Sequence, residues 1–196
     1  MALTAARRIT GATAAFAALV IVASAADNGS LADADRAVFE ALRARRDRAR
    51  TTIARAVSAL GEPAVIYPVL TIAAGCTARR VGWPRACMPC LVVAGGAAAR
   101  RRLSRVIARQ RPPADAWLTE PEGYSLPSKH TTLAALAAGA CARTLGMRGV
   151  PAHVATLLAA TSVGAGRVYL GVHWPADVVA GWLFAEGWLC LTGPEA

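Results

Sequence analysis

A short segment near the C-terminus contains the residues whose types and spacing best suit chemistry. In the run from Gly166 to Asp177, Arg167 is followed six positions later by His173 and four positions after that by Asp177. The run lies at the mouth of an apolar segment, where charged side chains are costly and usually functional. If His173 and Asp177 lie one helical turn apart, the carboxylate can hold the far ring nitrogen and leave the other free to attack.

A second polar cluster precedes this segment and contains Arg109, Arg111 and the tripeptide Ser128-Lys129-His130. Guanidinium groups offer planar forks that match phosphate oxygens. Two histidines can divide a displacement, one attacking phosphorus and the other protonating the leaving oxygen. Ser128 and the backbone N–H groups of a helix that begins there add neutral donors for an anion. The two clusters together predict phosphoryl transfer through a phosphohistidine.

No carboxylate cluster near these residues suits magnesium, so we expect neither a metal nor a cofactor. Individually, the residues also have structural interpretations. His173 beside Trp174 is typical of an interfacial aromatic belt, and Arg109 and Arg111 could bind lipid headgroups. His153 lies in a different apolar run, near the opposite face, and is expected to be structural.

The composition is that of a membrane protein. Of the 196 residues, 55% are hydrophobic and 17% are charged, and the formal net charge is +10. This length suits a single domain, residues 1–196. The sequence contains no nucleic-acid-binding motif, so the basic charge indicates membrane lipids and an anionic, lipid-linked substrate as partners. The five cysteines are an odd number and imply no disulfide framework, and Cys87 and Cys90 are interpreted as packing residues rather than half a zinc site.

Apolar periodicity predicts an all-α fold with about six transmembrane helices. Residues 56–196 would form the catalytic helical core, whereas residues 1–26 form a first span or, alternatively, a signal-like segment. Between them, residues 27–55 have the pattern of an amphipathic helix on the membrane surface, with a solvated linker helix as the alternative. The six apolar runs are Ile9–Ala26, Pro63–Cys76, Cys87–Ala99, Thr131–Leu145, Val150–Leu170 and Val178–Leu191.

The positions of these runs bring the two polar clusters to one face of the membrane. The first cluster lies between the third and fourth runs and the second between the fifth and sixth, so two crossings separate them. Helix continuation through Arg100 toward Arg109 is expected until Pro112 and Pro113 stop it, and the proline-containing segment 114–128 is expected to be an ordered loop. A composite site is therefore predicted.

At these residues the sequence resembles the type 2 phosphatidic acid phosphatase family, membrane relatives of the vanadium haloperoxidases. The family has three motifs: lysine, six residues and Arg-Pro; Pro-Ser-Gly-His; and Ser-Arg, five residues, His, three residues and Asp. The resemblance implies that His173 is the nucleophile, Asp177 its partner and His130 the general acid. It further implies a set of phosphate-binding residues, namely Arg111, Arg167 and Ser128. The corresponding segments are Ser104 to Arg111-Pro112, Pro127-Ser128-Lys129-His130, and Gly166-Arg167 to Asp177.

This chain departs from the family's motifs at three positions. Ser104 stands where the family has lysine, Lys129 where it has glycine, and Gly166 where it has serine. Our hypothesis is that Lys129, the only lysine of the sequence, partly replaces the missing amine as a phosphate-binding residue. Arg105 and Arg109 are second candidates, and the alternative is that Lys129 points into solvent.

The expected function is that of an integral membrane phosphatase that hydrolyses a lipid-linked phosphate monoester or pyrophosphate, of polyprenyl or phosphatidyl type. The alternatives are a polyprenyl-phosphoryl sugar phosphate phosphatase or a phosphotransferase of cell-envelope synthesis, and a catalytically weak scaffold that binds anionic lipid. Arg7 and Arg8 before the first run, with acidic residues after it, predict an extracytoplasmic site, although most of the 22 basic residues would then lie outside.

Overall fold

The computed structural model describes residues 2–192, with side chains from residue 5 onward. This part of the chain forms eight α-helices and one 3-10 helix, and no strand, in agreement with the predicted all-α class. In chain order they are α1 (Ala2–Ala25), α2 (Gly29–Arg43), α3 (Arg48–Ala59), α4 (Pro63–Val81), α5 (Trp83–Ile107), η1 (Ala114–Ala116), α6 (Lys129–Thr144), α7 (Val150–Tyr169) and α8 (Pro175–Thr192).

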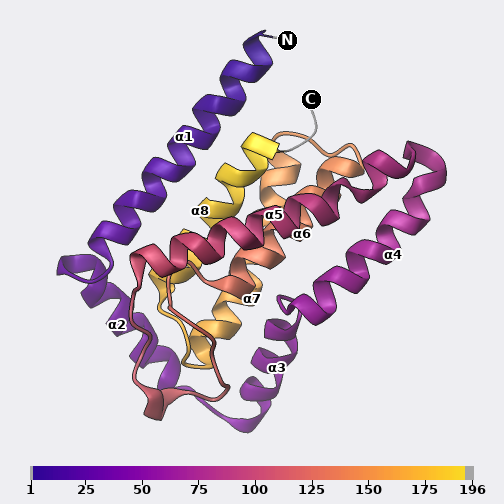
Figure 1. Cartoon of the computed structure of the whole chain (residues 1–196). Helices are drawn as coiled ribbons and strands as arrows, with labels where there is room; N and C mark the ends of the chain where they lie inside the picture. Colours follow the sequence, from indigo (N-terminus) through magenta and orange to yellow (C-terminus); the bar gives the residue numbers. More distant parts are fainter. Residues whose placement is uncertain (1, 193–196) are drawn as a thin grey trace.

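The helices pack around α6, which contacts α5, α7 and α8. Outside this group, α1 runs along α8, and α4 forms a hairpin with α5 (Figure 1). The largest buried apolar cluster joins these helices and includes Leu70, Val93, Leu136 and Leu189. Small residues allow the close approach, since a Cβ added to Gly139 in α6 would lie 2.4 Å from Thr156 Cγ2 in α7.

The segment predicted as one amphipathic helix consists of two helices. The chain leaves α2 at Ala44, and Asp47 caps α3 by accepting a hydrogen bond of 2.7 Å from the Arg50 N–H group. Contacts from elsewhere in the fold hold the break, because Arg46 donates to the carbonyl oxygens of Tyr169 and Ala116 at 3.0 and 2.8 Å. Residues 45–47 are Arg-Arg-Asp, and the prediction of one continuous helix places these charged residues on its polar side.

Among the described helices, Ala5–Ala25 is long and apolar enough to cross a membrane by itself. The pair formed by α3 and α4, bent by 49°, meets the same criteria when taken together. The prediction of about six spans is left untested by these criteria, which consider length and composition alone. Several of the other helices carry charged residues toward one end, as α5 does in Arg100-Arg101-Arg102.

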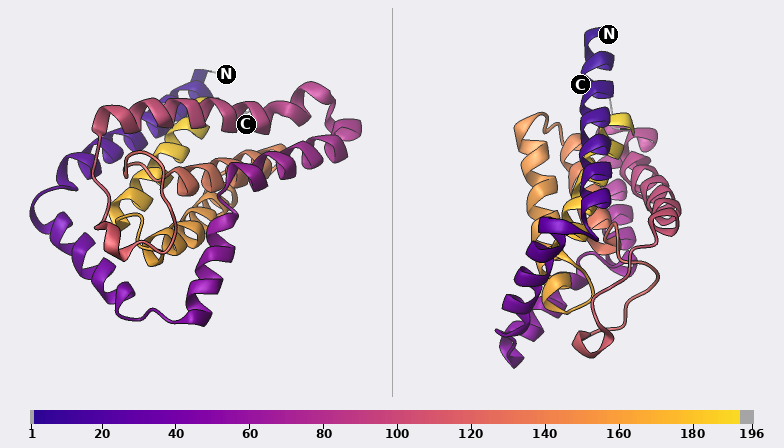
Figure 2. Two further views of the ribbon diagram at one scale, coloured as in Figure 1. Left: turned by 60° about the horizontal axis from the view of Figure 1, so that its bottom comes forward. Right: turned by 90° about the vertical axis from the view of Figure 1, so that its left-hand side faces the viewer.

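The polar connections gather at one end of the bundle. The loop from residue 108 to residue 128 and the turn before α8 lie at the same end as α2 and α3, as two views show (Figures 1 and 2). The third apolar run continues as a helix through the arginines to Ile107, as expected, and ends at Ala108 in a left-handed conformation with φ of 53°. The segments of the predicted composite site therefore lie together at this end of the bundle.

Candidate functional site

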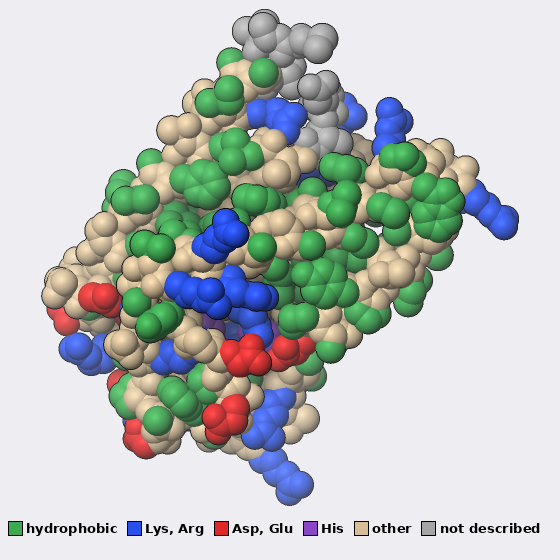
Figure 3. Space-filling model, in the orientation of Figure 1, with side chains coloured by type: hydrophobic (Ala, Val, Ile, Leu, Met, Phe, Trp, Pro, Cys, Tyr) green, Lys and Arg blue, Asp and Glu red, His purple; other side chains and the backbone are tan. Residues whose placement is uncertain are grey.

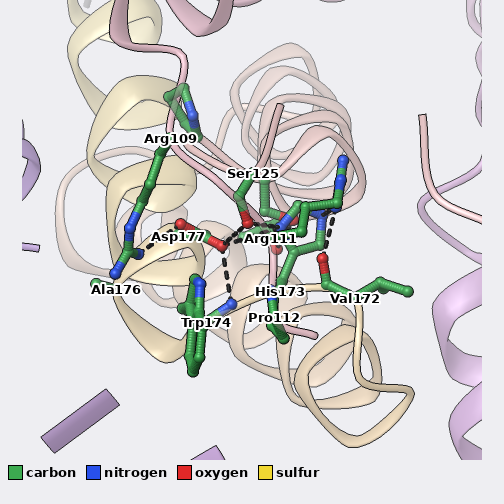
Figure 4. Close-up of polar contacts among 12 residues, drawn as sticks. Arg109, Arg111, Pro112, Ser125, Val172, His173, Trp174, Ala176 and Asp177 are labelled. Carbon is green, nitrogen blue, oxygen red and sulfur yellow. Dashed lines mark hydrogen bonds and ion pairs between the residues drawn. The ribbon is translucent and has the colours of Figure 1, made fainter. Parts of the chain in front are cut away.

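The start of α8 positions the aspartate and the histidine of the C-terminal motif. Trp174 precedes the helix, Pro175 is its first residue, and the Asp177 carboxylate accepts a hydrogen bond from the Trp174 N–H group at 2.8 Å. This is one half of a capping box, in which an acidic residue accepts from the N–H group three positions before it, and proline occupies the first helical position, which needs no donor. His173 is thereby held one turn before Asp177, and its Nδ1 lies 3.2 Å from Asp177 Oδ2 (Figure 4).

The surroundings of His173 fix its tautomer. Arg111 Nη1 lies 3.2 Å from His173 Nε2, and a guanidinium can only donate, so Nε2 must be the acceptor nitrogen. The proton consequently lies on Nδ1, facing the Asp177 carboxylate. His173 is 1% exposed, and burial, followed by the charges of Arg111 and Arg167, lowers its pKa to about 3 against the opposing effect of Asp177. A neutral imidazole with a lone pair on Nε2 is the form that attacks phosphorus.

Asp177 is fully buried and has a full set of donors. Arg109 Nη1 lies 2.7 Å from its Oδ1, and the Ser125 hydroxyl donates to Oδ2. Arg109 also donates to Asp35 at 2.8 Å and to Asp27 at 3.0 Å. Three carboxylates thus compensate the charge of Arg109. Arg109 therefore positions Asp177 instead of facing a phosphate, contrary to the suggestion from sequence.

Arg111 is held by the loop that follows it. Its Nε and Nη2 donate to the carbonyl oxygens of Glu122, Gly123 and Tyr124 at 2.8 to 3.0 Å, and Nη1 donates to Val172 at 2.5 Å. With the contact to His173, all five N–H groups are occupied. Burial lowers the pKa of Arg111 from its ordinary value, and no carboxylate of the described residues lies within ion-pair distance of it. The N–H group that Arg111 Nη1 donates to His173 Nε2 can instead be donated to a phosphoryl oxygen bound there.

Arg167 and His130 contribute buried polar atoms that have no partner among the described residues. Arg167, in the last turn of α7, is 4% exposed; its Nη1 donates to Ser58 Oγ at 3.2 Å, and its Nε has no partner. His130 is also 4% exposed; its Nε2 lies 2.7 Å from Glu62 Oε1, and its Nδ1 has no partner. Buried polar atoms of this kind are rare in native structures and suit a site for an anionic ligand.

The start of α6 completes the set. Ser128 precedes the helix and is fully buried, and Thr131 Oγ1 donates to its hydroxyl oxygen at 3.0 Å, so the Ser128 hydroxyl proton can be donated elsewhere. The Ser128 N–H group donates to the Asp177 carbonyl at 3.0 Å, which ties the two motifs together. A helix N-terminus at this point favours negative charge.

Lys129, predicted to bind phosphate, is paired with a carboxylate in this structure. Its Nζ forms an ion pair of 2.9 Å with Glu122, whose side chain is 83% exposed. Lys129 also lines a cavity of about 750 Å³ between α4, α5, α6 and the loop around Gly123. Ser104, the position of the family's lysine, lines the same cavity. Lysine and arginine side chains gather across the middle of this face, with carboxylates just beneath them (Figure 3).

Four residues that position the site were not recognised from the sequence. Glu62, which directly precedes the first residue of α4, contacts His130. Ser125, Ser58 and Asp35 have no motif and reach the site from separate segments. Among these four residues, Glu62 gave the usable signal, because a carboxylate directly before Pro63 marks the start of α4. This end of α4 faces the site.

The third histidine lies away from this site. His153, near the start of α7, contacts Glu186 of α8 through its Nδ1 at 2.7 Å. The five cysteines are free thiols. In the described part of the chain, no group of three or more histidine, cysteine or acidic side chains has an arrangement that could hold a metal ion.

Comparisons with known proteins agree with this geometry. The family model described as the PAP2 superfamily matches residues 85–193. A crystal structure of a transmembrane PAP2-type phosphatidylglycerolphosphate phosphatase from Bacillus subtilis is similar, with a TM-score of 0.80 and 25% sequence identity, over 93% of this chain and 94% of that chain. The comparison with curated proteins found no match.

Proposed function

Since the chain belongs to the PAP2 superfamily, we propose that it is an integral membrane phosphatase that hydrolyses a lipid-linked phosphate monoester or pyrophosphate. The observation that carries this proposal is the arrangement around His173 Nε2. A neutral imidazole, held by Asp177 in the attacking tautomer, points its lone pair at Arg111, and no carboxylate of the described residues lies within ion-pair distance of Arg111 or Arg167. Uncompensated cations that are buried or half-buried beside a nucleophile suit a phosphoryl group.

In the proposed reaction, His173 Nε2 attacks phosphorus in line with the leaving oxygen. The new P–N bond forms as the P–O bond to the lipid breaks, and His130 transfers its proton to the departing oxygen. Water then attacks phosphorus, gives a proton to His130 and displaces His173, which releases inorganic phosphate. Asp177 stabilises the charge that the imidazole gains when it is phosphorylated.

Three donors serve the equatorial phosphoryl oxygens in this scheme. Arg111 Nη1 transfers its N–H group from His173 Nε2 to an oxygen, Arg167 offers the unpartnered Nε, and Ser128 offers its hydroxyl proton. These residues can bind and transfer the group without a metal ion, so we expect activity in a chelator. The resting site is already shaped for the charge that develops in the transition state.

The lipid character of the substrate is supported by an apolar groove. It measures about 480 Å³ and lies between α4, α6 and α7, with Leu60 and Val163 among its lining residues. Val163 also approaches Gly61, where an added Cβ would lie 2.8 Å from both Val163 Cγ1 and His130 Cβ. One end of the groove therefore adjoins the general acid. The similar Bacillus subtilis protein, named a phosphatidylglycerolphosphate phosphatase, makes that lipid the first substrate to test.

The test measures phosphate release from a panel of lipid phosphates in EDTA, for wild type, His173→Ala and His153→Ala. We expect release from at least one lipid, a loss of about a thousandfold or more in His173→Ala, and no loss in His153→Ala, because His153 lies away from the site. Full activity in His173→Ala would contradict the proposal. No release from any lipid would favour an anionic-lipid scaffold, and recovery of the phosphate on an added alcohol would indicate transfer.

A further inference from the structure

Arg100 is a buried cation with no anionic partner. It lies in α5 and is 7% exposed, yet no carboxylate of the described residues lies within ion-pair distance. Its Nε donates to the Pro127 carbonyl oxygen at 2.7 Å, and Nη2 donates to the same oxygen. No described residue bonds to Nη1. A guanidinium buried in this way is costly unless an anion joins it.

The contrast with Arg109 shows that this end of the bundle does compensate structural charge. Arg109 is as deeply buried, and three carboxylates surround it within 2.7 to 3.0 Å. Arg100, by comparison, has one carbonyl oxygen. The charges of Arg111 and Arg101 repel it, and the favourable charge of Asp177 has a smaller effect than that of Arg111. The placement of Arg100 is therefore explained by a ligand better than by the fold.

Arg100 borders both the site and the cavity beside it. Its carbonyl partner, Pro127, directly precedes Ser128 at the start of α6. Arg100 and Ser104 are four residues apart, so they lie on the same face of α5, and both line the cavity of about 750 Å³. The backbone around Gly123 lines this cavity as well and also binds Arg111. A group held by Arg111 and Ser128 would have Arg100 on its cavity side.

We propose that Arg100 binds the phosphoryl group of the substrate through Nη1 and supplies the positive charge that Ser104 lacks. This inference rests on the proposed function, because it assigns a further phosphate-binding residue to the same site. The Pro127 carbonyl oxygen accepts hydrogen bonds from Nε and Nη2 of Arg100 and so fixes the orientation of the guanidinium. This contact also sets the direction of the Nη1 edge. Two features of this chain are thus paired. A serine stands at position 104, where the family has lysine, and an arginine lies one turn earlier on the same face of α5.

The experiment compares Arg100→Gln with Arg102→Gln, in the full-length protein. Arg102 lies two positions away in α5, is exposed and does not line the cavity, so it is a matched control. Two quantities are measured: kcat/KM with a lipid phosphate that the wild type hydrolyses, and the inhibition constant of inorganic phosphate. We expect Arg100→Gln to lower kcat/KM and raise the inhibition constant by about tenfold or more each, and Arg102→Gln to change neither beyond about twofold.

A second variant tests replacement of the charge. Arg100→Gln combined with Ser104→Lys places an amine one turn along the same face, and we expect it to recover a large part of the lost phosphate affinity. If Arg100→Gln does not fold, Arg100→Lys replaces it in the experiment. We then expect the affinity for phosphate to stay within about threefold of the wild-type value. An unchanged inhibition constant in Arg100→Gln would overturn the inference, even if kcat/KM fell, because the role would then be limited to positioning Pro127.

Failure of the proposed function gives a different result from failure of this inference. A wild type that releases no phosphate from any lipid contradicts the phosphatase assignment. Protection by inorganic phosphate against thermal unfolding then replaces the kinetic measurement. Protection of the wild type that is lost in Arg100→Gln and kept in Arg102→Gln supports Arg100 as an anion ligand, and equal protection of all three contradicts it.

Discussion

His130 and His173 need opposite protonation states in the proposed reaction. His173 must be neutral to attack, and its low pKa, about 3, ensures this at neutral pH. His130 must carry a proton for the leaving group, but burial, followed by the charge of Arg167, lowers its pKa to about 4. Glu62 opposes this shift. A bound phosphate brings further negative charge to the site and favours the protonated form.

The pH profile should report the contact between Glu62 and His130. Activity requires protonated His130 and is therefore lost as pH rises through its pKa in the working enzyme. Glu62→Gln removes a negative charge 2.7 Å from His130 Nε2, so it lowers that pKa. We expect the descending limb of kcat/KM to move to lower pH by about one unit. The measurement is kcat/KM against pH for both proteins.

Glu120→Gln is the control for the pH profile, because Glu120 is exposed on the loop before Pro121. We expect its profile to match that of the wild type. A shift of the descending limb to higher pH in Glu62→Gln would contradict the assignment of His130 as the acid that Glu62 supports.

The sequence identified the residues of the motifs but not the residues that hold them. His173 and Asp177 could be paired from spacing alone, since four residues make one helical turn. Glu62, Ser58 and Ser125 reach the site from distant segments through single hydrogen bonds, and no local periodicity encodes such contacts. The same is true of Arg109, whose burial among carboxylates is a property of the folded chain. Spacing thus predicted the chemistry, whereas folding supplied its orientation.

At the scale of the helices, the site is assembled from helix ends. α6 and α8 begin there, α7 ends there, and α2 covers it from outside through Asp35, which accepts a hydrogen bond from the Ala176 N–H group at 2.7 Å. Pro63 made the start of α4 predictable from sequence, whereas the last run was predicted to begin at Val178 and α8 begins at Pro175. The division between α2 and α3 was not predictable, because Arg46 contacts Tyr169 and Ala116 across the fold.

Arg109 is the residue that fastens α1 and α2 to the start of α8. Arg109→Met would leave Asp35 and Asp177 buried without their counter-ion, since both side chains are at most 3% exposed. We expect a loss of stability of about 3–5 kcal/mol, the usual cost of breaking a buried ion pair. The measurement is thermal unfolding of the purified protein in detergent.

Arg36→Met provides the comparison for this loss. Arg36 forms an ion pair of 3.6 Å with Asp33 in the same region, with both side chains more than two-thirds exposed. A pair of this kind contributes about 1 kcal/mol or less. Equal decreases in melting temperature for the two variants would show that Arg109 does not fasten the helices.

At the scale of the whole molecule, the apolar runs identified the helical core, and their order correctly brought both polar clusters to one end. The number of membrane crossings follows less directly from sequence. Arginines continue the helix beyond the apolar part of α5, and several runs are short, so hydropathy alone does not delimit the spans. Burial among neighbouring helices permits charge that a lone span would exclude.

The predicted orientation can be tested with two thiols at opposite ends of the bundle. Glu120→Cys places a thiol on the loop at the site end, and the natural Cys76 is exposed near the far end of α4. If the site is extracytoplasmic, a membrane-impermeant maleimide should label position 120 in intact cells and reach Cys76 only after permeabilisation. Glu120→Gln, which keeps the five natural cysteines and adds no thiol at position 120, is the control, and the reverse pattern of labelling would place the site in the cytoplasm.

The contact between Arg111 and His173 also keeps the nucleophile of the resting enzyme unreactive. The lone pair of His173 Nε2 accepts a hydrogen bond from one N–H group of Arg111, whose other four N–H groups are held by the loop at residues 122–124 and by Val172, so it is shielded from stray protons and from neutral electrophiles. A ligand gains the nucleophile only by offering an oxygen that competes for that one hydrogen bond. Selection for negatively charged oxygen therefore takes place before any bond is broken, at the same atom that afterwards carries out the attack.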